Sequence, residues 1–286
     1  MKQILVISGK GGTGKTFFTG CLAVGISNKV IVDCDVDAAN LHLLLHPFIE
    51  QSFEFFGGKK ASIDKEKCTL CGICREVCQF RAITDDFQVD TISCEGCTIC
   101  SYVCPASAIV FYEALSGYYF ISQTEYGKMV HAKLGIAQEN SGKLVAKLRE
   151  IAKEIAETTK ADFIILDGPP GVGCPVMASM TGVDLAIAIT EPTVAGVHDV
   201  KRVIELAKHF KVDLKVLINK YDLNPEMSQH ITTHLEKEGV EVIGVIPFSE
   251  EILESVKAGI PYLKFSQSIL AIKIQQLIYK ILEKIA

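Results

Sequence analysis

Short apolar runs recur along the chain and alternate with longer stretches in which apolar residues return every three or four positions. The runs predict strands at residues 3–8, 30–34, 162–167, 183–190, 214–219 and 242–246. The longer stretches predict helices at residues 17–28, 140–157, 195–210, 225–238 and 266–285. Because the strands are apolar throughout, we expect burial on both faces, as in a doubly wound, mostly parallel α/β sheet.

This alternation stops between residues 58 and 112. There, residues 68–83 (CTLCGICREVCQFRAI) match residues 94–109 (CEGCTICSYVCPASAI) at a shift of 26 positions. The doubling predicts a small two-fold domain at 58–112, inserted into a larger domain formed by residues 1–57 and 113–286. Residues 113–139 predict strands or a hairpin that returns the chain to the sheet.

The helix at residues 266–285 is amphipathic, which raises the question of a membrane. We expect its apolar positions to pack in the core; these are Ile269, Ile272, Leu277, Tyr279 and Ile281. No apolar run reaches the roughly 18 residues that a membrane helix needs. Residues 1–10 form an apolar strand leading into glycines, unlike a signal peptide. We therefore expect a cytoplasmic protein without stable membrane insertion.

Composition narrows the class of partner. The chain has 286 residues, of which 49% are hydrophobic and 22% charged, so it is predicted to be globular rather than disordered. Its net charge is −5. A surface that neutralises phosphates needs the opposite sign, so nucleic acid is not expected as a partner.

Eleven cysteines in a chain without a secretion signal point to metal rather than to disulfides. Eight of them form two runs with the C-x2-C-x2-C-x3-C spacing of bacterial two-cluster ferredoxins. In that pattern the fourth cysteine of each run ligates the other cluster. The predicted ligands of the first [4Fe-4S] cluster are Cys68, Cys71, Cys74 and Cys104, and those of the second are Cys94, Cys97, Cys100 and Cys78. Two structural zinc sites remain the alternative, because four thiolates also suit zinc.

The other three cysteines lie outside these runs. Cys21 and Cys34 fall in a predicted helix and strand, where a free cysteine usually acts as a small core residue. Cys174 follows a glycine-rich turn. It could either cap the following helix or act as a cluster ligand, and both roles remain alternatives.

A phosphate-binding loop follows the first predicted strand. The segment Gly9-Lys10-Gly11-Gly12-Thr13-Gly14-Lys15-Thr16 fits G-x-x-x-x-G-K-[ST] and precedes a helix, as this motif requires. Its backbone N–H groups would surround the phosphates, Lys15 would reach the β and γ oxygens, and the Thr16 hydroxyl would bind Mg²⁺.

The second lysine, Lys10, makes the loop resemble that of the deviant-Walker ATPases, the MinD, ParA, Mrp and nitrogenase iron protein group. The resemblance implies that Lys10 reaches the phosphates of a partner subunit, although a solvated charge is the alternative. It also implies that Asp35 activates the attacking water and that Asp33 and Asp167 hold Mg²⁺. We expect Asp37 only to cap a helix from Ala38.

Asn219-Lys220-Tyr221-Asp222 formally fits the N-K-x-D guanine signature of GTPases. The resemblance instead implies that Asn219 and Pro247 line an adenine pocket. We therefore expect ATP, with GTP as the alternative.

Taken together, the chain resembles a MinD/Mrp-type P-loop ATPase carrying an inserted two-cluster ferredoxin domain. The implied function is ATP hydrolysis that switches a homodimer, or a heterodimer with a related ATPase, and gates electron transfer or metallocluster assembly. The implied partner is a redox or cluster-acceptor protein. The alternative is an ATP-switched scaffold or positioning protein with structural or sensory clusters.

Overall fold

The computed structural model describes residues 1–135 and 140–285. The chain divides into two compact units. The first unit contains Met1–Ser52, Tyr119–Lys133 and Ser141–Ala286, and the second contains Phe53–Tyr118 and Leu134–Asn140. That residues 58–112 form a separate functional domain, as the cysteine repeat indicates, stays a prediction.

Nine strands in the described residues form one sheet. Their bounds are β1 Lys2–Ser8, β2 Lys29–Asp33, β3 Phe48–Ile63, β4 Ile109–Thr124, β5 Gly127–Leu134, β6 Phe163–Pro170, β7 Leu185–Thr190, β8 Asp213–Asn219 and β9 Glu241–Ile246. The strand order is β3-β4-β5-β2-β6-β1-β7-β8-β9. The run from β5 to β9 pairs in parallel throughout, so the carboxyl ends of these strands share one edge.

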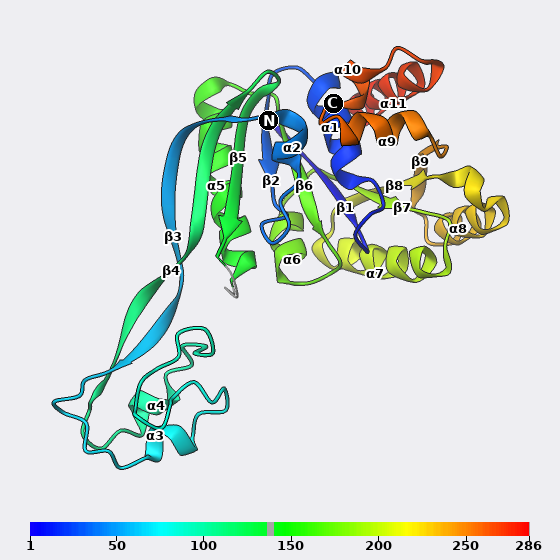
Figure 1. Ribbon diagram of the computed structural model, residues 1–286. Coiled ribbons are helices and arrows are strands. Elements are labelled where there is room, and N and C mark those ends of the chain that lie inside the picture. The colour runs from blue at the N-terminus through cyan, green and yellow to red at the C-terminus, as the bar shows by residue number, and fades with distance from the viewer. Residues whose placement is uncertain (136–139, 286) are drawn as a thin grey trace. The chain divides into compact units, whose positions relative to one another are not determined.

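Helices cover both faces of the sheet in the first unit (Figure 1). On one face lie α1 (Lys15–Gly25), α2 (Leu41–Leu45), α9 (Glu250–Lys257), α10 (Tyr262–Phe265) and α11 (Ile269–Ile285). On the other lie α5 (Ser141–Thr159), α6 (Cys174–Met180), α7 (Val194–Phe210) and α8 (Pro225–Lys237). The strands require cover on both faces because both faces are apolar. In β1, for example, the successive residues Ile4, Leu5, Val6 and Ile7 point alternately to opposite faces and are all fully buried.

The six strands predicted from apolar runs and the five predicted helices are all confirmed, within a few residues at their ends. The expected hairpin at 113–139 is also found, as β4 and β5 joined by a two-residue turn, although 136–139 lie outside the described residues. Periodicity missed β3, whose residues 48–54 are exposed and carry no apolar alternation. It also missed α9 and α10, because helices of four to eight residues are too short to show a period. Periodicity did not reveal α2 and α6 either, which were expected only through the capping roles considered for Asp37 and Cys174.

The expectation for α11 is partly wrong. Of the residues expected to pack in the core, Ile281 is buried, but Ile269 is 75% exposed and Tyr279 is 56% exposed. Ile272 is exposed as well, and Leu277 is only partly buried. The buried stripe is Ala271, Ile274, Ile278, Ile281 and Ile285, whose spacing of three, four, three and four residues keeps it on one side of the helix. No helix in the described part of the chain is long and apolar enough to cross a bilayer.

The second unit contains two one-turn helices, α3 (Ile73–Glu76) and α4 (Ile99–Tyr102), together with most of β3 and β4. Its buried core is small and consists of Ala61, Cys74, Ala82, Ile83, Cys94 and Ile109. Three further cysteines, Cys78, Cys100 and Cys104, pack against it. Cysteine therefore supplies much of the interior of this unit.

Candidate functional site

The predicted phosphate loop connects β1 to α1, and its last two residues form the start of the helix. Gly14 has a φ of 101°, in the left-handed region that favours glycine. A Cβ atom there would lie 2.5 Å from Nδ2 of Asn219, at the end of β8. That amide nitrogen donates to the carbonyl oxygen of Thr13 over 2.8 Å. Glycine therefore permits a close contact that holds the loop against the carboxyl end of β8.

Thr13 provides independent evidence that the loop is a binding site. Its residue is 2% exposed, and its Oγ1 atom has no hydrogen-bond partner among the described residues. Leaving a buried hydroxyl unpaired costs about 1–3 kcal/mol. A ligand with acceptor oxygens would remove this cost, and phosphate has such oxygens.

Two carboxylates and two hydroxyls meet where β2, β6 and α1 come together. Asp33 and Asp167 lie opposite each other in register and are 1% and 2% exposed. Oγ1 of Thr16 donates to Oδ2 of Asp167 over 3.0 Å. Oγ1 of Thr19, one helical turn after Lys15, donates to Oδ1 of Asp167 over 2.8 Å. The structure thus brings the predicted Mg²⁺ ligands together. It also places Thr19, which is not part of the motif, in a hydrogen bond with one of them.

Burial dominates the electrostatics of these acids. Desolvation raises the pKa of Asp33, Asp35 and Asp167, and for Asp167 the pKa rises to about 6. The charge of Asp167 adds to the shift at Asp33, whereas Lys15 opposes the shifts at Asp35 and Asp167. A divalent cation beside these oxygens would relieve the repulsion between them.

The segment after β2 differs from the prediction in one respect. Oδ1 of Asp33 accepts from the backbone N–H of Asp35 over 3.1 Å, and its Oδ2 accepts from the N–H of Leu41 over 3.2 Å. Because Leu41 is the first residue of α2, the expectation that Asp37 caps a helix from Ala38 is wrong. Asp33 itself binds the first N–H group of that helix, which helps to fix the turn containing Asp35.

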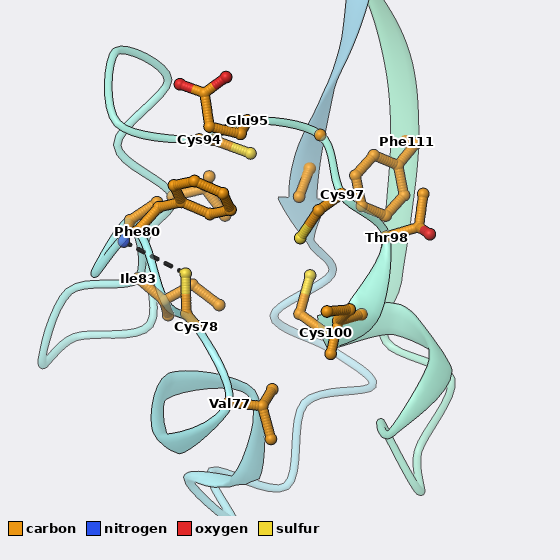
Figure 2. A pocket seen from close by; sticks show the side chains of 15 residues that line it. Val77, Cys78, Phe80, Ile83, Cys94, Glu95, Cys97, Thr98, Cys100 and Phe111 are labelled. Atoms are coloured by element: carbon orange, nitrogen blue, oxygen red, sulfur yellow. Dashed lines mark hydrogen bonds between the residues drawn. The ribbon is translucent and has the colours of Figure 1, made fainter.

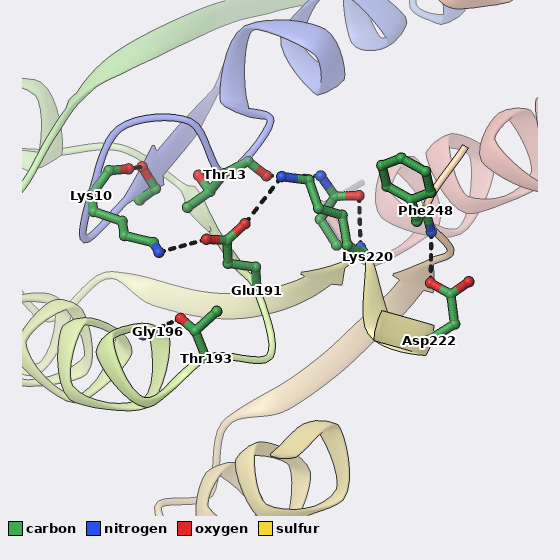
Figure 3. A network of polar contacts seen from close by, with 10 residues as sticks. Lys10, Thr13, Glu191, Thr193, Gly196, Lys220, Asp222 and Phe248 are labelled. Atoms are coloured by element: carbon green, nitrogen blue, oxygen red, sulfur yellow. Dashed lines mark hydrogen bonds and ion pairs between the residues drawn. The ribbon is translucent and has the colours of Figure 1, made fainter. Parts of the chain in front are cut away.

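Lys10 lies in a charged network at the same edge of the sheet (Figure 3). Its Nζ atom is 2.5 Å from Oε1 of Glu191, which directly follows β7. Oε2 of Glu191 is 3.1 Å from Nζ of Lys220, which follows β8. Although burial acts to raise it, hydrogen bonds from the two lysines bring the pKa of Glu191 below its usual value. Glu191 was not among the predicted site residues, although its position directly after an apolar strand was a usable signal.

The predicted base-binding residues lie on two neighbouring loops. Asn219 pairs in register with Ile246, so Pro247 follows β9 at the same sheet edge. Oδ1 of Asp222 accepts from the N–H of Phe248 over 2.7 Å, as Figure 3 shows. The carboxylate of the formal N-K-x-D motif therefore joins these two loops to each other.

Eight cysteines of the second unit line two cavities. One is lined by Cys78, Cys94, Cys97 and Cys100, whose sulfur atoms face a common space in Figure 2. The other is lined by Cys68, Cys71, Cys74 and Cys104. Each cavity takes three cysteines from one run and the fourth from the other run. This grouping is the one that the spacing predicts, while ligation itself stays a prediction.

Among residues 1–135 and 140–285, no three Cys, His, Asp or Glu side chains lie close enough together to hold one metal ion. This finding concerns single ions. A tetrahedral zinc site draws four thiolates to about 2.3 Å from the metal, whereas a cubane of four irons and four sulfides separates them by its own width.

The three remaining cysteines divide into two kinds. Cys21 and Cys34 are fully buried, as expected of small core residues, and burial raises the pKa of both thiols. Cys174 is exposed and is the first residue of α6. Its role stays open.

A comparison with known protein families assigns the chain to a family. The family model described as the CobQ/CobB/MinD/ParA nucleotide binding domain matches residues 4–262. The chain belongs to this family. The predicted α/β P-loop fold of the MinD type is thereby confirmed, whereas the family description does not address the cysteine runs.

Individual relatives of this nucleotide-binding chain agree with the assignment. An uncharacterised protein of Methanocaldococcus jannaschii is 38% identical over 225 residues, which cover 78% of this chain and 79% of the relative. The cell division ATPase MinD of Pyrococcus furiosus has a similar fold, with a TM-score of 0.61 at 21% identity over 100% of this chain and 99% of that one. MinD of Pyrococcus horikoshii, solved with Mg-ADP, gives 0.60 at 21% identity over 98% and 95%.

Proposed function

We propose that the protein is a magnesium-dependent ATPase with two [4Fe-4S] clusters, in which the nucleotide state of a dimer gates delivery of electrons or of an assembled cluster to a partner protein. The proposal joins the nucleotide-binding family to the cysteine cavities of the second unit. The single observation that carries it is the division of eight cysteines into two cavities with crossed membership.

Several features of the first unit support ATP and Mg²⁺. The unpaired Oγ1 atom of buried Thr13 suits a phosphate oxygen. Thr16, Asp33 and Asp167 offer the oxygen atoms that Mg²⁺ prefers, next to the lysine that would face the β and γ phosphates. The cation would supply charge neutralisation during phosphoryl transfer. Asp35, close enough to Lys15 to feel its charge, would orient the attacking water.

Lys10 supports a switch between two arrangements. In the isolated chain it pairs with Glu191 of the same subunit. Action on the phosphates of a homodimeric or heterodimeric partner would require Lys10 to leave Glu191. The ion pair would then be exchanged for contacts with phosphate when the dimer forms.

The donor chemistry of the second unit fits [4Fe-4S] clusters. Each cavity offers four thiols and is otherwise lined largely by apolar side chains, including Phe80 and Phe111 in one and Phe87 in the other. Hydrogen bonds to cysteine sulfur are also present, since the N–H groups of Ala82 and Ala108 donate to Sγ of Cys78 and Cys104 over 3.4 Å. Such bonds stabilise thiolate ligands, and a bound cluster would supply one-electron transfer.

The preference for ATP over GTP rests on the similarity to MinD of Pyrococcus horikoshii, which was solved with Mg-ADP. One oxygen of Asp222 accepts from the backbone N–H of Phe248, but a carboxylate has a second acceptor oxygen, so this contact does not select the base. Competition between ATP and GTP for the purified protein tests this preference. Tighter binding of GTP would contradict it.

The test of the whole proposal starts with protein purified without oxygen. Iron and acid-labile sulfide are measured first, and about eight of each per chain are expected from two clusters. ATP hydrolysis is then compared with oxidised and with reduced clusters. A rate that depends on the redox state supports coupling.

A second candidate is an ATP-switched positioning protein, favoured by the similarity to cell division ATPases. It predicts clusters without redox coupling, hence equal ATPase rates in both states. Stoichiometric zinc with negligible sulfide would instead contradict the iron-sulfur assignment.

A further inference from the structure

The cysteine repeat has a structural counterpart in the second unit. Backbone hydrogen bonds recur in pairs at a shift of 26 residues. The N–H of Asp64 donates to the carbonyl oxygen of Ala108 over 2.8 Å, and its counterpart is the bond from the N–H of Asp90 to the carbonyl oxygen of Ala82 over 2.7 Å. Likewise, the N–H of Cys68 donates to the oxygen of Asp64, and the N–H of Cys94 donates to the oxygen of Asp90, both over 3.0 Å. The contacts to Cys78 and Cys104 sulfur recur in the same way. The two cavities thus have equivalent frameworks, against which any difference between them stands out.

The first difference between the described residues of the two frameworks is a buried cation beside the cavity that contains Cys94. Lys60 on β3 is 9% exposed, and its Nζ atom donates to the carbonyl oxygen of Cys94 over 2.5 Å. The repeat places Asp86 at the equivalent position, 26 residues later. Asp86 is exposed and accepts from the side chains of Thr84 and Gln88 over 2.5 and 2.6 Å. At this pair of positions a buried positive charge on one side thus corresponds to an exposed negative charge on the other. The cavity beside Lys60 is also lined by Glu95, which is exposed and therefore screened by solvent, and the equivalent residue of the other cavity is Thr69.

The second difference lies in the loops between the first two cysteines of each run. Gly96 has a φ of 62°, and a Cβ atom there would lie 2.2 Å from the carbonyl oxygen of Lys59. This loop therefore packs directly on the backbone of β3. The equivalent residue in the other run is Leu70, which has a φ of 57° and is 66% exposed. The loop of the second run therefore touches β3 at Gly96, whereas Leu70, the equivalent residue of the first run, is exposed.

We propose that Lys60 sets the reduction potential of the cluster bound by Cys78, Cys94, Cys97 and Cys100, making it the stronger oxidant of the two. This inference rests on the proposed iron-sulfur function. A cluster gains one negative charge on reduction, and a nearby buried cation stabilises that state because little solvent screens the interaction. Asp86, which is exposed, acts on the other cluster only through water and counterions.

An electron distribution follows from this difference. When an external one-electron donor reduces one cluster per chain, the electron resides mainly at the cavity beside Lys60. The cavity with the exposed Leu70 loop then holds the more weakly oxidising cluster.

The experiment is an anaerobic redox titration of the full-length protein, followed by electron paramagnetic resonance. Cys71→Ser and Cys97→Ser assign the signals, because each perturbs one cavity. Lys60→Met and Lys60→Gln remove the charge, and glutamine retains a hydrogen-bond donor. Lys60→Arg retains the charge. Lys59→Met is the matched control, because it removes an exposed lysine from the next position of the same strand.

We expect both uncharged variants to weaken electron binding at the second cluster about tenfold, which is 59 mV for one electron. Lys60→Arg and Lys59→Met should leave the potential close to that of the unchanged protein, and the first cluster should shift little in every variant. Unchanged potentials in Lys60→Gln and Lys60→Met, or equal shifts of both clusters, would overturn the inference but not the proposed function. Absence of iron and sulfide from the unchanged protein would overturn both.

Discussion

The two units differ in what fills their interiors. The first unit buries large apolar side chains such as Phe18, Leu22, Ile31 and Leu148 between a sheet and helices on both faces. The buried core cluster of the second unit consists of two isoleucines, two alanines and two cysteines, with more cysteines packed around them. Burial of a large apolar side chain contributes about 1.5–3 kcal/mol to the free energy of unfolding. Hydrophobic packing can therefore stabilise the first unit, whereas the second unit buries few such side chains. Its order should therefore depend on what its cysteines bind.

The largest expected effect is the loss of order in the second unit when its clusters are removed. Chelation of iron should accelerate amide hydrogen exchange by more than about a hundredfold within residues 53–118, because ligand binding supplies much of the folding free energy there. Peptides from β6 and β7 should exchange as before. Retained protection in the second unit would show that its small apolar core suffices.

Effects of comparable size are expected at the phosphate loop. Lys15→Ala should lower ATP turnover by about 10²–10³-fold and weaken ATP binding, because it removes a phosphate-neutralising charge. Asp35→Ala should abolish turnover while ATP stays bound. Kinetics and equilibrium binding measure the two effects, and iron content should not change. Full activity of either variant would contradict the assigned role.

Single cysteine variants test the crossing between the two runs. Cys78→Ser should remove the cluster shared with Cys94, Cys97 and Cys100, and Cys104→Ser the other, each lowering iron by about half. Cys21→Ser is the control outside the cavities. Electron paramagnetic resonance identifies the cluster that is lost. If Cys78→Ser damages the first cluster instead, the crossed assignment is wrong.

The first unit should also respond to acid through one buried histidine. Desolvation, with a smaller effect of the nearby His42, lowers the pKa of His131 to about 4, and its Nε2 atom lies 2.9 Å from Oγ of Ser122. The unfolded chain binds a proton near pH 6.5, so stability is lost as the pH falls from 6.5 to 4. The loss should reach about 3 kcal/mol.

Urea unfolding of the first unit at a series of pH values measures this loss. His131→Gln should flatten the profile over that interval, and exposed His230→Gln should not. Equal slopes for His131→Gln and the unchanged protein would refute the role of His131.

The smallest expected effect concerns Glu191. Glu191→Gln should strengthen ATP-dependent dimerisation a fewfold, because Lys10 no longer has to leave a charged partner, and partly exposed ion pairs contribute about 1 kcal/mol or less. Glu238→Gln, which breaks the exposed pair with Lys208, is the control. Sedimentation with and without ATP measures the change. Weaker dimerisation of Glu191→Gln would mean that Glu191 assists Lys10 rather than holding it.

The sequence alone predicted the parts that depend on local pattern. Parallel strands buried on both faces must be apolar throughout, so β1, β6 and β7 could be read directly. The phosphate loop and the cysteine runs could also be predicted from the sequence, because their chemistry requires fixed residue types at short, fixed spacing. The predicted grouping of Cys78 with the second run also follows from spacing.

Tertiary structure alone decided which distant residues meet. No local sequence pattern links Lys10 to Glu191 or Lys60 to Cys94. Each pair forms only because strand pairing and loop conformation bring distant parts of the chain together. The buried stripe of α11 was misjudged for the same reason: several faces of that helix carry isoleucine, and only its packing against β9 and α1 selects one. Likewise, the repeat makes the two cysteine runs nearly equivalent in sequence, and their surroundings in the fold make them different.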